Sequence, residues 1–126
     1  MKTVLIAEHE TTTAKWLRYV LAREGYHALS APSGLEALAV IATDRPDLIL
    51  LSADLPGLDA QDVLWDLRTY QGRCELPVVV IFPPGNLARR AANLSQFADC
   101  CIQRPFSEQF LVAIVGRLLN TGQAAP

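Results

Sequence analysis

Apolar residues along the chain fall into short runs that alternate with segments of helical period. Five runs are predicted strands, at residues 3–7, 26–30, 47–51, 77–82 and 100–103. The runs at 3–7 and 47–51 are apolar almost throughout, which is typical of strands covered on both faces. Because each run is followed by a helical pattern, the chain predicts a parallel sheet with helices packed against it.

The predicted helices begin at residues that commonly cap helices. Ser33 and Glu36 form a capping-box pattern, Asp59 or Asp62 caps the third helix, and Ser107 caps the last. The predicted buried stripes of the five helices are Ala14, Leu17, Val20 and Leu21; Leu35, Leu38, Ala39 and Ala42; Val63, Leu64 and Leu67; Leu87, Ala91 and Leu94; and Phe110, Leu111, Ile114, Val115 and Leu118.

The handedness of crossover connections limits how five parallel strands can be arranged. The commonest arrangement at this size has the strand order 2-1-3-4-5. We therefore predict the α/β class and a flavodoxin-like, doubly wound (βα)5 sandwich of three layers. The chain of 126 residues fits one domain at residues 1–121, and residues 122–126 are expected to be a tail or the start of a linker.

Composition narrows the classes of function. Hydrophobic residues make up 51% and charged residues 19%, which is enough apolar surface for a core. The formal net charge of −2 provides no basic field, so no nucleic-acid binding is expected. No apolar run approaches the roughly 20 residues that span a bilayer, so no membrane association and a cytoplasmic location are expected. Cys74, Cys100 and Cys101 lack CxxC spacing, and we expect no metal site, cofactor or disulfide framework.

The candidate site follows from the predicted topology. In open parallel sheets, ligands bind beyond the carboxyl ends of the strands where the winding direction reverses. Five residues follow or end these strands and are the candidates for chemistry: Glu8, His9, Ser52, Phe82 and Arg104.

Several segments carry a resemblance to a known family. They are VLIAEHE at 4–10, GYHALSAPSGLEAL at 25–38, PDLILLSADLPGLD at 46–59, PVVVIF at 77–82 and RPF at 104–106. Their order and spacing resemble the receiver domain of bacterial two-component response regulators over about residues 2–120. The resemblance implies a domain in which three acidic residues hold Mg²⁺ and one of them, an aspartate, accepts a phosphoryl group from a kinase.

The resemblance also assigns positions, and most depart from the family pattern. The acidic pair after the first strand falls on Glu8 and His9, and the phosphoacceptor falls on Ser52. Three further positions contact the phosphoryl group or report the activated state. These are Phe82 for a small hydroxyl residue, Cys101 for an aromatic residue and Arg104 for a lysine.

These departures predict the loss of receiver chemistry. One carboxylate remains, and we expect Glu8 to pair with Arg104, which leaves no surplus negative charge for Mg²⁺. The Ser52 hydroxyl needs a base, and His9 is the nearby candidate. A Ser52–His9–Glu8 triad lacks the G-x-S-x-G elbow. Asp54 is an alternative acceptor, although a solvated loop carboxylate is the simpler interpretation.

The sizes of two core residues are exchanged relative to the family. The large residue is Phe82 on the fourth strand and the small one is Cys101 on the fifth. We expect Phe82 to fill the space that an activating aromatic would enter, which locks one conformation. Neutral repacking of the core is the competing interpretation.

The leading hypothesis is a non-enzymatic pseudo-receiver that binds another signalling protein without phosphorylation, through the face from helix four to helix five. Arg89 and Arg90 are the candidate partner-binding residues, with plain solvation as the alternative, and the same face offers a route to a homodimer. A phosphorelay receiver that uses a non-standard residue, as the N-terminal regulatory domain of a larger regulator, is the second hypothesis. A small-ligand module, or a redox module using Cys100 and Cys101, is the third.

The exposed aromatic candidates lie on two of the predicted helices. Trp16 and Tyr19 are one turn apart on the first helix and Trp65 is on the third, each beside the apolar stripe. We expect these rings to be partly buried at the helix flanks rather than to form a binding hot spot.

Overall fold

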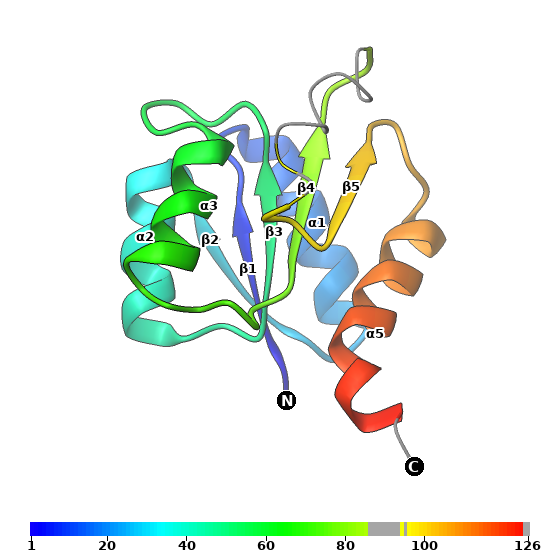
Figure 1. Ribbon diagram of the computed structural model, residues 1–126. Helices are drawn as coiled ribbons and strands as arrows, with labels where there is room; N and C mark the ends of the chain where they lie inside the picture. Colours follow the sequence, from blue (N-terminus) through cyan, green and yellow to red (C-terminus); the bar gives the residue numbers. More distant parts are fainter. Residues whose placement is uncertain (86–93, 95, 125–126) are drawn as a thin grey trace.

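The computed structural model describes residues 1–85, 94 and 96–124. The strands are β1 Thr3–Ala7, β2 His27–Ala31, β3 Leu48–Ser52, β4 Val78–Phe82 and β5 Cys100–Gln103, and the helices are α1 Thr11–Arg23, α2 Gly34–Asp44, α3 Ala60–Thr69 and α5 Glu108–Ala124. Strands and helices alternate along most of this order (Figure 1). The predicted α/β class is confirmed.

The five strands form one parallel sheet of order β2-β1-β3-β4-β5, as predicted. β2 and β3 each begin one residue later than the sequence indicates. At β2 the reason is local, because the Tyr26 amide donates to the Leu21 carbonyl at 3.1 Å and so closes the end of α1 instead of joining the sheet. The strand register therefore starts at His27.

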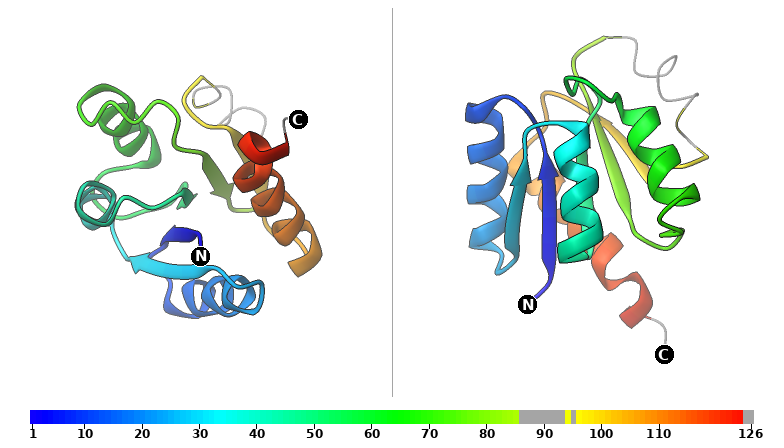
Figure 2. Two further views of the ribbon diagram at one scale, coloured as in Figure 1. Left: turned by 90° about the horizontal axis from the view of Figure 1, so that it is seen from below. Right: turned by 90° about the vertical axis from the view of Figure 1, so that its left-hand side faces the viewer.

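Helices cover both faces of the sheet, which gives the three predicted layers (Figure 2). Successive strand residues point to opposite faces: Val4 and Ile6 pack with α1 and α5, whereas Leu5 and Ala7 pack with α2 and α3. No helix among the described residues is long and apolar enough to span a bilayer.

The sheet has two ends with different surroundings. The chain enters β1 at one end, here called the amino edge, and the carboxyl-terminal end of α5 lies toward the same end (Figure 1). The opposite end, the carboxyl edge, is where the parallel strands finish and the candidate residues lie. The amino terminus and the carboxyl-terminal end of α5 are thus remote from the candidate site.

Three predicted caps are present. Ser33 Oγ accepts from the Glu36 amide at 3.2 Å, and Asp59 Oδ1 accepts from the Asp62 amide at 2.9 Å. Ser107 Oγ accepts from an amide in the first turn of α5 at 3.0 Å. The choice left open between Asp59 and Asp62 is therefore settled in favour of Asp59.

The predicted buried stripe of α2 is wrong in its orientation. Leu35 is 70% exposed, and Ala39 and Ala42 also face solvent, whereas Ala37 and Ile41 are fully buried. The helix carries apolar residues around most of its circumference, so the spacing of apolar residues alone does not indicate which face is buried. Packing of the helix against the sheet determines the buried face.

Two predictions concern segments near the limits of the described chain. The predicted fourth helix lies outside the described residues except for Leu94, which is buried, and so do Arg89 and Arg90. Helix α5 continues to Ala124, past Gly122 where a tail was expected to begin. A glycine inside a helix costs about 1 kcal/mol and does not by itself end the helix.

The largely buried side chain of Arg68 connects α3 to the loops at the amino edge. The Arg68 side chain donates to the carbonyls of Phe97 at 2.7 and 3.0 Å, of Arg73 at 2.7 Å and of Leu76 at 2.7 Å. It also lies 3.3 Å from Asp99 Oδ2. One cation thereby satisfies three backbone acceptors that belong to no regular element.

Candidate functional site

The candidate residues meet at the carboxyl edge because the hydrogen-bond ladder continues just past the strands. The Glu8 amide donates to Ala31 O at 3.0 Å, and the Arg104 amide donates to Phe82 O at 2.9 Å. These bonds fix the backbone of both residues relative to neighbouring strands. Glu8, Ser52 and Arg104 therefore lie at the carboxyl edge, where the topology predicts them; that they form a functional site stays a prediction.

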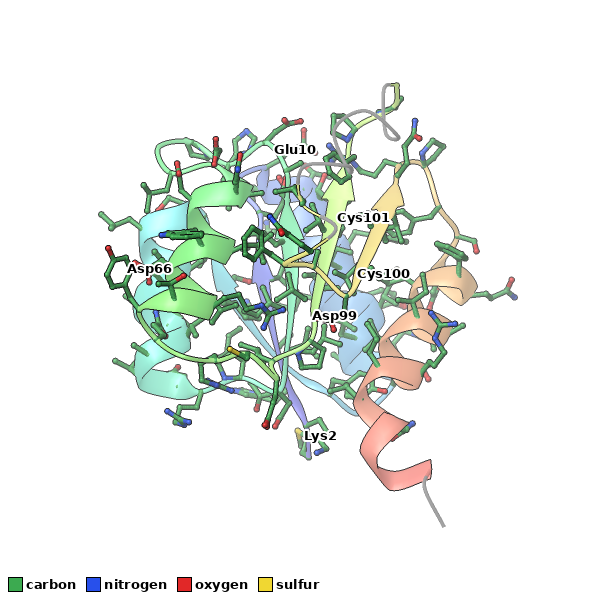
Figure 3. The ribbon with its side chains drawn as sticks, in the orientation of Figure 1. Lys2, Glu10, Asp66, Asp99, Cys100 and Cys101 are labelled. Carbon is green, nitrogen blue, oxygen red and sulfur yellow. The ribbon has the colours of Figure 1, made fainter. Side chains whose placement is uncertain are left out.

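Glu8 is the buried acid of the site. It is 5% exposed, and its Oε2 accepts from the Glu10 amide at 3.0 Å and lies 3.5 Å from His9 Nδ1. Oε1 is buried and has no hydrogen-bond partner among the described residues. Figure 3 places Glu10 at the carboxyl edge. The expected pairing of Glu8 with Arg104 is wrong, because no ion pair joins these two described residues. Glu8 Oε2 instead contacts His9 and the Glu10 amide, which are adjacent in the chain.

Ser52 is sequestered at the end of β3. It is 2% exposed, and its Oγ accepts from the Asp54 amide at 3.3 Å. No hydrogen bond joins Ser52 to His9 in the described part of the chain, and the His9 side chain is half exposed and lies beside Glu8. The contacts therefore do not build the Ser52–His9–Glu8 triad, because the base does not reach the nucleophile.

Phe82 and Cys101 pack in the same core cluster, on the α2 and α3 face of the sheet. Phe82 is 1% exposed, and Cys101 is partly buried against the cluster. Cys100 packs on the opposite face, as expected for neighbouring strand residues (Figure 3). Burial raises the pKa of both thiols above the ordinary value, and for Cys100 the positive charge of Arg117 offsets part of that rise. Thiols of raised pKa are poor nucleophiles at neutral pH.

The donor set does not fit the magnesium site that the resemblance implies. Mg²⁺ requires an octahedron of oxygen ligands and usually relies on more than one carboxylate. Glu8 offers one free carboxylate oxygen, Ser52 a hydroxyl and His9 a nitrogen. No three His, Cys, Asp or Glu side chains are grouped for a metal within the described ranges.

Arg104 lies at the carboxyl edge, and its positive charge has no ion-pair partner among the described residues. Its Nε is buried without a hydrogen-bond partner, and no ion pair of its side chain forms within the described part of the chain. It lines a groove together with Trp16 and Phe106, whose ring centroids are 5.9 Å apart. Phe106 in turn lies 6.5 Å from Phe110.

Sequence reasoning did not find this aromatic groove. Three aromatic residues were expected to be partly buried: Trp16, Tyr19 and Trp65 are 38%, 60% and 53% exposed. Trp16 is the most buried of the three and agrees best with the expectation. The contact of Trp16 with Phe106 joins segments far apart in the sequence. The sequence does show an aromatic residue, Phe106, directly after Arg104 and Pro105. Its ring partner, Trp16, can be identified only from the fold.

Comparisons with known proteins agree with this architecture. The sequence model described as "Response regulator receiver domain" matches residues 4–116. The chain is 33% identical over 117 residues to the response regulator MprA of Mycobacterium avium (strain 104), covering 93% of this chain and 50% of that protein. The chain thus spans half the length of such curated relatives.

Solved structures show the same likeness. A signal receiver domain of a signal transduction histidine kinase from Syntrophus aciditrophicus is 25% identical with a TM-score of 0.88, over 100% of this chain and 96% of that one. NtrX from Brucella abortus is 28% identical with a TM-score of 0.86, over 96% of this chain and 28% of that one. The chain therefore belongs to the response regulator receiver domain family of two-component signalling.

Proposed function

We propose that this receiver domain is a pseudo-receiver, which binds a partner protein without being phosphorylated. The observation that carries the proposal is the state of Ser52 at the phosphoacceptor position. Ser52 is 2% exposed, and its hydroxyl accepts a hydrogen bond from the Asp54 amide; among the described residues no basic side chain is hydrogen-bonded to it. A hydroxyl must lose its proton to attack phosphorus, whereas the aspartate of the family attacks as it stands.

The charge of the pocket supports the same proposal. Glu8 is its one buried carboxylate, and Arg104 adds a positive charge at the same edge. A phosphoryl donor arrives with several negative charges, which the family neutralises with a metal ion. A site with one carboxylate and an imidazole holds such an ion weakly, so the transition state for phosphoryl transfer gains little stabilisation.

Phe82 supports a single fixed conformation. The ring is 1% exposed within a close-packed cluster that includes Cys101 at its border. The switch of the family needs space for an aromatic side chain to move inward, and interiors packed at this density do not provide such space without strain. We infer that the domain presents one constant surface to its partner.

The partner surface that we propose includes β5 and α5. A hollow of about 490 Å³ lies between them, and Phe110 on its rim is 48% exposed. Exposed aromatic rings beside a hollow are common anchors at protein interfaces. The partner is another signalling protein in the cytoplasm, or a second copy of this chain, and the domain has no enzymatic activity of its own.

Treatment with Mg²⁺ and acetyl phosphate or beryllofluoride tests the proposal. We expect no shift of amide resonances near Ser52 and no added phosphate by mass spectrometry. The matched control restores the family residues through His9→Asp, Ser52→Asp, Phe82→Thr and Arg104→Lys, and this variant should gain an acyl phosphate. Phosphate on the unaltered chain at Ser52 or Asp54 contradicts the proposal.

One observation favours the second hypothesis, a phosphorelay receiver with an unusual acceptor. The Glu8 Oε1 atom is buried and has no partner among the described residues, and such an oxygen is stabilised by a bound cation. In that case the domain regulates a larger protein, as the twofold length of the curated relatives suggests. Magnesium-dependent shifts at Glu8, together with a phosphorylated product, support this alternative.

A further inference from the structure

The groove beside Arg104 differs from the rest of the carboxyl edge in its chemistry. It has a volume of about 360 Å³, and Trp16, Leu17, Ile81 and Phe106 contribute apolar surface to it. It lies on the α1 and α5 face of the sheet, since Leu17 and Ile81 belong to the core on that face and Phe106 packs against it. Phe82 and Cys101 lie on the other face. The groove is therefore separate from the core positions of the family switch.

Aromatic rings form one wall of this groove. The Trp16 and Phe106 rings are tilted by 50° with centroids 5.9 Å apart, and Trp16 is 38% exposed. Rings in this tilted arrangement leave faces and edges available to a third ring. A flat aromatic body placed in the groove would extend the cluster and cover apolar surface that water now contacts.

Among the described residues that line the groove, Arg104 alone carries a charged side chain. The other described lining residues are apolar or, like Thr12 and Thr13, neutral hydroxyl residues, and none of them is an aspartate or a glutamate. The guanidinium is unpaired in the described structure and its Nε is buried. A cation beside apolar walls attracts an anion more strongly than one in open water, because the local dielectric constant is lower.

We propose that this groove binds a small aromatic carboxylate, with its ring against Trp16 and Phe106 and its carboxylate on Arg104. The volume lies at the lower end of the range for small-molecule sites, about 300 to 1,000 Å³, so a ligand of one or two fused rings fits. Arginine pairs with a planar carboxylate through two parallel hydrogen bonds. The inference does not depend on whether Ser52 is phosphorylated.

The test uses two probes of the same shape and different charge. The ¹⁵N-labelled chain is titrated with 2-naphthoate and, separately, with the neutral 2-naphthamide, up to millimolar concentrations. We expect shifts at the Trp16 indole and at the amides of Thr13 and Phe106. We also expect naphthoate to bind about tenfold or more tightly than naphthamide, as the loss of a charge-assisted hydrogen bond implies.

Two variants and two matched controls assign the site. Arg104→Gln should remove the preference for the anion, and Trp16→Ala should weaken both probes about tenfold. Lys15→Gln removes a neighbouring positive charge outside the groove, and Trp65→Ala removes an exposed indole on the other face of the sheet, so both should bind like the unaltered chain. Trp16→Phe replaces Trp16→Ala if circular dichroism shows that the alanine variant is unfolded.

Four results would overturn the proposal. The first is equal affinity for the two probes, the second is an unchanged preference in Arg104→Gln, and the third is the absence of shifts at Trp16. Concentration-dependent broadening at Trp16 and Phe106 without any probe also contradicts it, because a second copy of the chain would then cover the groove.

Discussion

Arg68 provides the sharpest test of how the fold is held together. We consider Arg68→Met, which keeps an unbranched apolar stem and removes the guanidinium. The carbonyls of Phe97, Arg73 and Leu76 then lose a charged donor at 2.7 to 3.0 Å. The side chain of Arg68 is 12% exposed, so water replaces these bonds only in part.

The magnitude follows from the number of acceptors. A loss of about 1 to 1.5 kcal/mol for each of three carbonyls gives about 4 kcal/mol. Domains of this length are stable by about 6 to 19 kcal/mol, so the variant should fold but with a melting temperature lower by about 15 °C. Urea and thermal unfolding followed by circular dichroism measure both quantities.

A second arginine serves as the control. Arg18 is exposed and donates one hydrogen bond to the Ala28 carbonyl at 3.2 Å, so Arg18→Met should change the free energy of unfolding by less than about 0.5 kcal/mol. If Arg68→Met costs less than about 1 kcal/mol, water satisfies the three carbonyls and the assigned role of the guanidinium is wrong.

Three further predictions concern packing, capping and titration. Gly34→Ala should lower the free energy of unfolding in urea by about 1 to 3 kcal/mol, because the added Cβ would lie 2.6 Å from Leu58 O. The control Gly116→Ala places its Cβ 3.9 Å from Tyr26 Oη and should stabilise α5 by about 0.5 to 1 kcal/mol. If Gly116→Ala were the more destabilising of the two, the packing assigned to Gly34 would be wrong. Asp59→Ala should cost about 1 kcal/mol through the lost cap of α3, and an unchanged urea midpoint would show that water replaces it. The pKa values of Cys100 and Cys101 are raised in the folded chain, so the unfolded chain releases these protons at a lower pH. The free energy of unfolding should therefore fall as the pH rises above the ordinary thiol pKa of 9.0. The double variant Cys100→Ala, Cys101→Ala should show a smaller fall, and a fall equal to that of the unaltered chain would contradict the role given to these thiols.

The positions of the strands could be predicted because they depend on patterns that lie within single segments, and their order followed from the handedness of crossover connections. The run at 47–51 is apolar at four of five positions and matches β3 to within one residue. Caps at Ser33 and Asp59 act over three residues and are visible in the sequence for the same reason. Helix α2 is an exception, since its apolar residues encircle the helix and tertiary packing decided that Leu35 faces solvent. The prediction for α5 is also wrong at Phe110, which was placed in the buried stripe and is 48% exposed.

The site was predictable in its residues but not in their contacts. The sequence placed Glu8 and Arg104 at one edge, but which partner Glu8 takes depends on distances that no spacing gives. The Glu10 amide and His9 are adjacent in the chain and so are near Glu8 at little entropic cost. The guanidinium contacts of Arg68 and the ring contact of Trp16 with Phe106 join distant segments, and single-sequence patterns contain no information on such pairs.

The position of the two chain ends has a practical consequence. The amino terminus and the carboxyl-terminal end of α5 lie toward the amino edge (Figure 1), whereas Glu8, Ser52 and Arg104 follow or end strands at the carboxyl edge. An affinity tag, a fluorescent fusion or a biosensor linker attached at either end is thus directed away from Ser52 and from the groove beside Arg104. Immobilised binding measurements on this domain should accordingly retain full access to both.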